Sequence, residues 1–192
     1  MTVDGVYEAP GGEKSLGERS GWTFPYANEE MMKFKHDELF SSDALLLGRV
    51  TYEGFAAAWP TMQGAGDFGE RMNGLPKYVV SKTLGTAGAT DGAGAASNAL
   101  AWNNSRVISG NFVEEIAKLK NEPGQDILVY GSGTLFRSLL ENDLVDEYRL
   151  MVFPVILGVG KKLFGDLPHK KELKFKEVKP FESGIVVVTY TK

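Results

Sequence analysis

The feature that most constrains the fold is a pair of short apolar segments that each end in glycine and lead into a helical pattern. Leu45–Leu47 is followed by Gly48, and Ile127–Tyr130 is followed by Gly131-Ser132-Gly133. Continuous apolar runs of this length are typical of strands that are covered on both faces, as in a mainly parallel sheet. Two strand–glycine–helix units therefore predict an α/β fold.

Periodicity and turn residues predict the remaining elements. Further strands are expected at 78–80 and 106–108, and helices at 28–42, 67–75, 111–122 and 135–140. Asn111 and Glu114 form a cap-like pair at the start of the third helix. After Asp146, strands are expected at 148–153, 173–178 and 184–190, the last two antiparallel and closing the sheet.

Residues 85–98 contain almost only Gly, Ala, Ser, Thr, Asn and Asp. Such a composition buries too little surface to offset its ordering entropy. We expect a flexible insertion within a single domain that spans residues 1–192.

Composition excludes several functional classes. The net charge of −4 and the lack of a basic patch with interleaved aromatics argue against nucleic acid as a partner. The basic residues between His169 and Lys176 are interpreted as the solvated face of a strand. No apolar run reaches the length of a membrane span, no secretory signal opens the chain, and cysteine is absent. The expected location is the cytoplasm, without membrane contact and without a metal site.

The turn after the first strand reads Gly48-Arg49-Val50-Thr51. A helix that opens directly after a glycine offers free N–H groups and a positive dipole end to an anion. Arg49 could pair with phosphate oxygens and Thr51 could donate its hydroxyl. The alternative is that Gly48 only makes the turn and Arg49 forms a surface salt bridge.

The second turn, Gly131-Ser132-Gly133-Thr134-Leu135, strengthens the first. Both turns would lie at the carboxyl ends of strands, where open α/β sheets bind ligands, and could face the two phosphates of one dinucleotide. The third glycine of the dinucleotide fingerprint is missing, with Phe136 in its place. Ser81 and Lys82 lie at the end of another strand and could hold the extra phosphate that NADPH has and NADH lacks. An ordinary polar turn is an equal alternative for this segment.

These motifs resemble a known family. Gly48-Arg49-Val50-Thr51-Tyr52-Glu53 resembles the Gly-Arg-x-Thr-aromatic-Glu motif of dihydrofolate reductases. The chain as a whole is similar to the riboflavin-biosynthesis reductase (RibD C-terminal) family, on the segments Val3–Gly5, Tyr130–Leu135, Leu144–Glu147 and Pro154–Gly160.

The resemblance implies a three-layer dihydrofolate-reductase-like fold, with helices flanking a mainly parallel central sheet that carries an antiparallel C-terminal edge. It also implies NADPH as cofactor and a homodimer. The implied cofactor-binding residues are Gly48, Arg49, Thr51, Ser81, Lys82, Gly131, Ser132, Gly133, Thr134 and Leu135.

This chain departs from the family in three respects. Only three residues precede Asp4, so either the opening strand is shortened or Met1 is an internal methionine. The segment 85–98 exceeds the family's usual length, and the zinc deaminase signature of the two-domain riboflavin enzyme is absent.

Hydride transfer by a nicotinamide cofactor commonly needs a proton from the protein. Asp4 and Glu29 are the candidate catalytic acids, although a turn-forming Asp-Gly and a dipole-favoured first-turn Glu explain them as well. Aromatic residues that could line the pocket of a flat substrate are Trp22, Phe24, Tyr52, Phe55 and Trp59, and core packing explains part of this set.

The predicted function is an NADPH-dependent reductase that acts on a small planar heterocycle or carbonyl, such as a pterin or a ribosylaminopyrimidine. The alternative is a dimeric nucleotide-binding module without turnover.

Overall fold

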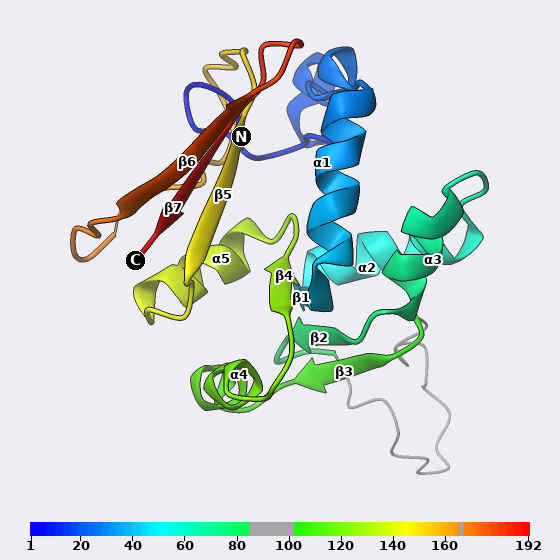
Figure 1. Ribbon diagram of the computed structural model, residues 1–192, viewed down its shortest axis with the longest axis vertical. Coiled ribbons are helices and arrows are strands. Elements are labelled where there is room, and N and C mark those ends of the chain that lie inside the picture. Colours follow the sequence, from blue (N-terminus) through cyan, green and yellow to red (C-terminus); the bar gives the residue numbers. More distant parts are fainter. Residues whose placement is uncertain (85–101, 166) are drawn as a thin grey trace. The chain divides into compact units, whose positions relative to one another are not determined.

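The computed structural model describes residues 1–84, 102–165 and 167–192. These residues form two compact units (Figure 1). The parallel-sheet unit comprises Lys35–Phe136, and the antiparallel-sheet unit comprises Met1–Phe34 together with Arg137–Lys192. The insertion predicted at 85–98 lies outside the described residues.

Most helices and strands begin and end within about two residues of the ranges predicted from the sequence. The α-helices are α1 (Glu29–Phe40), α2 (Arg49–Ala58), α3 (Gly66–Gly74), α4 (Phe112–Lys120) and α5 (Gly133–Glu141). The strands are β1 (Ser42–Gly48), β2 (Lys77–Val80), β3 (Ser105–Ile108), β4 (Asp126–Val129), β5 (Glu147–Val152), β6 (Lys174–Pro180) and β7 (Val186–Thr191). Short 3₁₀ turns are η1 (Lys14–Arg19), η2 (Phe24–Tyr26) and η3 (Trp59–Thr61).

The parallel-sheet unit is built on four parallel strands in the order β3-β2-β1-β4. The side chains of β1 from Ala44 to Leu47 are buried, as expected for a central strand with both faces covered. Its apolar core includes Leu39, Leu45, Leu47, Tyr52, Met72, Leu75, Val79, Leu84 and Trp102.

The antiparallel-sheet unit contains the sheet β5-β7-β6. The first residues of the chain run beside the end of β5, with Thr2 bridged in parallel to Phe153. Its core includes Trp22, Met151, Phe153, Phe181, Ile185 and Val187. The predicted α/β class with antiparallel C-terminal strands is thus confirmed, and within this unit β6 and β7 form a three-stranded antiparallel sheet with β5.

One predicted helix cap is absent, and another that was not predicted is present. Asn111 precedes α4 but makes no side-chain capping hydrogen bond. Asn28 does cap α1, because its Oδ1 accepts the Met31 N–H at 2.9 Å. Within the described residues, no helix is both long enough and apolar enough to span a bilayer.

Candidate functional site

The two predicted glycine turns lie directly against each other. The backbone N–H of Gly48 donates to the Ser132 hydroxyl at 2.8 Å. A Cβ added to Gly48 would lie 3.5 Å from Ser132 and 3.6 Å from Leu135, and one added to Gly131 would lie 3.3 Å from the Thr51 methyl. The turns after β1 and β4 therefore form one continuous piece of surface.

Strand order explains this contact. From β1 the chain passes through α2, η3 and α3 to β2, which is the neighbour of β1 on one side. From β3 it passes through α4 to β4, which is the neighbour of β1 on the other side. The direction of winding thus reverses between β1 and β4 (Figure 1). Gly48 ends β1 and Gly131 follows β4, so both residues lie at a topological switch point. Open α/β sheets bind ligands outside the carboxyl ends of the strands at such a point.

The first turn of α2 offers hydrogen-bond donors at this point. Gly48 is the N-cap residue, with φ −79° and ψ 159°, and no side chain caps the helix. The N–H groups of a first helical turn have no partner inside the helix, and the dipole adds partial positive charge there. Arg49 and Val50, the first two residues of α2, are exposed, and so are Gly131 and Thr134 in the second turn. The arrangement can accept an anion.

The close approach of the two turns depends on the missing side chains of the two glycines. Gly131 has φ +61°, a left-handed conformation that favours glycine, and its turn leads into Gly133, the first residue of α5. Because neither Gly48 nor Gly131 carries a Cβ, the two turns can pack closely, with Ser132 and Leu135 beside Gly48 and Thr51 beside Gly131. The uncapped N–H groups at the start of α2, next to the second turn, fit a diphosphate group.

Arg49 is paired within its own helix. Its guanidinium donates to both carboxylate oxygens of Glu53, at 3.1 and 3.3 Å, and both side chains are about half exposed. This is the surface salt bridge that the sequence left open as the alternative. Since exposed pairs of this kind contribute little, Arg49 can exchange Glu53 for a phosphate at small cost.

Ser81 and Lys82 differ in their environment. Ser81 is buried, and its Oγ accepts the N–H groups of Thr83 at 3.2 Å and of Leu84 at 3.0 Å. That geometry is the polar turn given above as the alternative for this segment. Lys82 is exposed, so its ammonium group is accessible to a ligand, whereas the Ser81 hydroxyl is not.

Most of the predicted substrate-binding aromatics pack into cores. Tyr52 is 3% exposed and its hydroxyl accepts the Trp102 N–H. Phe55 and Trp59 pack against the same core and against each other, and the Phe55 ring also contacts the Trp102 ring. In the antiparallel-sheet unit, Trp22 is buried and donates from its ring N–H to the Glu8 carbonyl at 2.8 Å.

Phe24 differs from the other aromatics because its side chain is 62% exposed. Its ring lies on glycine backbone: Cβ atoms built at Gly12 and Gly21 would lie 3.4 and 2.9 Å from it. Of the five predicted aromatic residues, Phe24 has the largest exposed surface to offer a ligand.

The two candidate acids are in contrasting surroundings. Asp4 accepts hydrogen bonds from the Thr2 hydroxyl at 2.6 Å and from the Gly158 N–H at 2.8 Å. The Thr2 bond first, and the backbone bonds from Gly158 and Leu157 after it, lower the pKa of Asp4 from 3.8 to about 2. Asp4 is therefore a carboxylate at neutral pH, a state that accepts protons. Glu29 is the exposed first residue of α1.

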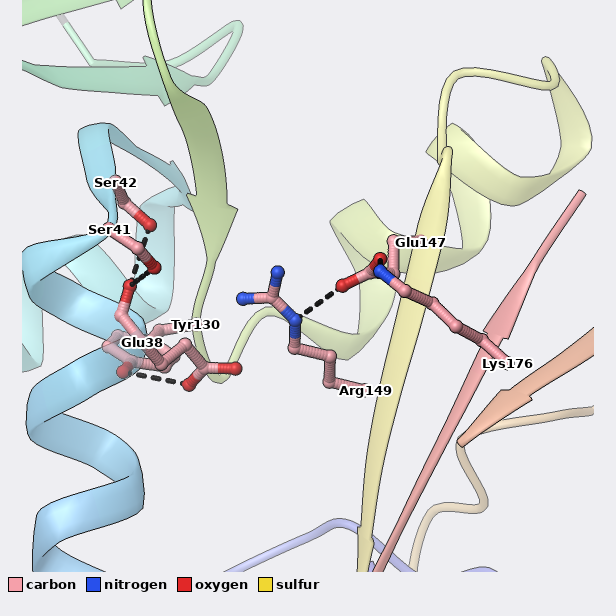
Figure 2. A network of polar contacts seen from close by, with 7 residues as sticks. All are labelled: Glu38, Ser41, Ser42, Tyr130, Glu147, Arg149 and Lys176. Atoms are coloured by element: carbon pink, nitrogen blue, oxygen red, sulfur yellow. Dashed lines mark hydrogen bonds and ion pairs between the residues drawn. The ribbon is translucent and has the colours of Figure 1, made fainter. Parts of the chain in front are cut away.

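Sequence reasoning missed a buried polar network beside the second turn. Glu38 on α1 is only 8% exposed, and its carboxylate accepts the Tyr130 hydroxyl at 3.0 Å (Figure 2). The hydroxyls of Ser41 and Ser42 donate to the Glu38 carbonyl. Nothing in the helical spacing of α1 distinguishes Glu38 from a solvated glutamate.

A second missed residue is Lys77, which is fully buried at the start of β2. Its ammonium donates to the carbonyls of Asn73, Leu75 and Asn103 at 2.8, 2.7 and 3.1 Å, and lies 4.3 Å from the Trp102 ring centre. It satisfies carbonyls at the C-terminal end of α3, where a cation is favoured.

Of the basic residues interpreted as a solvated strand face, Lys174 and Lys176 lie on β6, whereas His169, Lys170 and Lys171 precede it. All residues of β6 are exposed, and Lys176 pairs with Glu147, which also accepts the Arg149 guanidinium (Figure 2). Lys170 pairs with Glu172 and Lys171 with Asp143. Lys170, Lys171 and Lys176 are therefore each paired with a carboxylate.

Comparison with known proteins identifies a family and a relative. A family model described as the RibD C-terminal domain matches residues 1–187. The uncharacterized protein YyaP of Bacillus subtilis (strain 168) is 30% identical over 193 residues, covering 99% of this chain and 90% of that protein.

Solved structures agree with the fold. A pyrimidine reductase-like protein from Corynebacterium diphtheriae superposes with a TM-score of 0.57 at 15% identity, over 100% of this chain and 88% of that one. A diaminohydroxyphosphoribosylaminopyrimidine deaminase/5-amino-6-(5-phosphoribosylamino)uracil reductase from Thermotoga maritima gives 0.63 at 14%, over 99% of this chain and 54% of that one. The chain thus spans about half of the bifunctional protein, and the likeness concerns the fold.

Proposed function

Since the chain belongs to the RibD C-terminal domain family, we propose that it is an NADPH-dependent reductase that transfers hydride to a small planar heterocycle or carbonyl. The family typically uses NAD(P)H. The substrate class proposed is a pterin or a ribosylaminopyrimidine, because the similar proteins include a pyrimidine reductase-like protein and a 5-amino-6-(5-phosphoribosylamino)uracil reductase.

One observation carries the proposal: the turns after β1 and β4 touch through Gly48 and Ser132 at the switch point of the parallel sheet. The first turn of α2 and the backbone around Gly131 would hold the diphosphate, with Thr51 beside them. Arg49 and the exposed Lys82 would supply positive charge to the 2′-phosphate. When bound, the reduced nicotinamide supplies the hydride.

The experiment is a fluorescence titration of wild type, Arg49→Ala and Lys82→Ala with NADPH and with NADH. If these cations meet the 2′-phosphate, NADPH binding weakens by about 1–3 kcal/mol per lost contact while NADH binding changes little. Equal losses for both cofactors would point to diphosphate contacts, and no binding of either cofactor by wild type would refute the proposal.

A second candidate is a nucleotide-binding module without turnover. It is favoured by the surroundings of the two candidate acids: Asp4 accepts hydrogen bonds from Thr2 and Gly158, and Glu29 is the exposed first residue of α1. Absorbance assays of NADPH oxidation with dihydrofolate and with a ribosylaminopyrimidine separate the two candidates. Oxidation with either substrate supports the reductase, and tight binding without oxidation supports the module.

A further inference from the structure

Tyr130 is the residue that joins the end of β4 to the glycine turn at Gly131. Its ring is partly buried, and its hydroxyl donates to the Glu38 carboxylate at 3.0 Å (Figure 2). The Lys35 ammonium lies 4.9 Å from the centre of the same ring and 3.7 Å from the Glu38 carboxylate. The residue that precedes the turn is thus fixed by a buried carboxylate on α1.

The placement of Glu38 connects three elements. Its backbone carbonyl accepts the hydroxyls of Ser41 and Ser42 at 3.0 and 2.8 Å, at the junction where α1 ends and β1 begins. Its side chain reaches the end of β4. A buried carboxylate is costly unless its hydrogen bonds are satisfied, so the network holds these elements in one arrangement.

We propose that Glu38 and Tyr130 are positioning residues that hold the Gly131–Gly133 turn in its binding geometry, an inference that rests on the proposed binding of NADPH at this turn. Two glycines make the turn intrinsically flexible, and ordering it only on binding would cost conformational entropy. Anchoring Tyr130 fixes the residue before the turn, so that Ser132 stays within reach of the Gly48 N–H. The free protein then meets the cofactor with the turn already formed.

The test uses Tyr130→Phe, Glu38→Ala and Glu38→Gln, with Tyr78→Phe as the matched control. Tyr78 lies in β2 of the same sheet, and among the described residues its hydroxyl has no hydrogen-bond partner. The first readout is amide hydrogen exchange of the cofactor-free protein over residues 129–136, and the second is the NADPH dissociation constant.

Tyr130→Phe and Glu38→Ala should speed exchange in 129–136 relative to the rest of the sheet and weaken NADPH binding on the order of tenfold, which corresponds to one lost hydrogen bond to a charged group. Glu38→Gln should restore most of the affinity, because its amide oxygen can still accept the tyrosine hydroxyl. Tyr78→Phe should change neither readout.

The outcomes separate this inference from the proposed function. Unchanged exchange in 129–136 for Tyr130→Phe overturns the positioning role, whether or not NADPH binds. Faster exchange together with unchanged NADPH affinity also overturns it. If wild type binds no NADPH, the proposed function fails, and exchange alone then decides whether Glu38 and Tyr130 hold the turn.

Discussion

The backbone N–H of Gly48 donates to the hydroxyl of Ser132, 84 residues away in the chain, at 2.8 Å. The bond joins the start of α2 to the turn before α5, so two helix N-termini open at one place. It also leaves the Ser132 hydroxyl hydrogen free to donate to a further acceptor. The relationship makes Ser132 a structural link between the turns as well as a candidate ligand contact.

Replacing Ser132 by alanine should therefore weaken NADPH binding on the order of tenfold, because the Gly48 N–H loses its acceptor and the turns lose their link. Isothermal titration calorimetry measures the effect. Ser105→Ala is the control: its hydroxyl is buried in β3 and has no hydrogen-bond partner among the described residues. Equal affinities for the two variants would contradict the link.

Alanine should have different consequences at the two glycines. Gly131→Ala forces a residue with a Cβ into φ +61° and brings that atom within 3.3 Å of Thr51, so unfolding free energy should fall by about 1–2 kcal/mol. Gly48→Ala keeps φ at −79° with contacts of 3.5 Å or more, so stability should change little.

We nevertheless expect NADPH affinity to fall in Gly48→Ala, because the added methyl would lie at the contact between the two turns, 3.5 Å from Ser132 and 3.6 Å from Leu135. Urea unfolding and NADPH titration of the same two variants give both quantities. A Gly48→Ala protein that binds NADPH as tightly as wild type would place the phosphates elsewhere.

Glu53 competes with a phosphate for Arg49. Glu53→Gln removes the charged partner at 3.1 Å and frees the guanidinium. NADPH binding should tighten by up to about fivefold, because exposed pairs of this kind contribute about 0.2–1 kcal/mol. Fluorescence titration at low salt measures the change. No tightening for NADPH would indicate that Arg49 does not leave Glu53 for the cofactor.

The Asp4 carboxylate should make stability fall in acid. Its pKa is about 2 in the folded protein and 3.8 without these hydrogen bonds, so the unfolded chain binds more protons between these values. Its contribution is complete above pH 3.8 and is lost as the pH falls toward 2. Urea unfolding of wild type and Asp4→Asn at pH 6, 4 and 3 tests this, and a stability difference that stays constant over the range would be evidence against it.

Lys77 should make stability rise with pH in the same direction as Asp4, but in the alkaline range. Burial lowers its pKa from 10.5 to about 8, so the unfolded chain binds more protons between these values and unfolding free energy rises with pH there. The stability of wild type relative to Lys77→Met should increase from pH 8 to pH 10.5. Lys77→Arg offers a control that stays charged throughout. A flat difference between wild type and Lys77→Met would show that the amine does not titrate in this range.

Short-range signals predicted the elements well. The apolar run at 44–47 and the Gly48 that follows it define β1 and the start of α2, because a central strand and a helix opening each need local residue types. The pairing of β6 and β7 with β5 was not predicted, because alternation of apolar and polar residues indicates a strand but does not identify the strand that it pairs with. The cap at Asn28 was recognisable in principle, because Asn directly before a helix is a common N-cap.

Part of the candidate site could likewise be predicted from the sequence, and part could not. The glycine turns at Gly48 and Gly131 are visible in the chain, whereas the partners of Arg49 and Ser81 are not. Both residues carry chemistry suited to phosphate, and both have protein partners within four residues. Competition between a ligand and a neighbouring group is decided by geometry that residue type does not encode.

By itself, the sequence determined the α/β class and the two strand–glycine–helix turns, because strand burial, helix periodicity and the need for glycine are properties of consecutive residues. Only the tertiary structure decided that the two turns touch, that Glu38 holds Tyr130, and that Lys77 is buried among carbonyls. Those relationships depend on strand order and on distances between residues far apart in the chain, which packing of the whole unit selects.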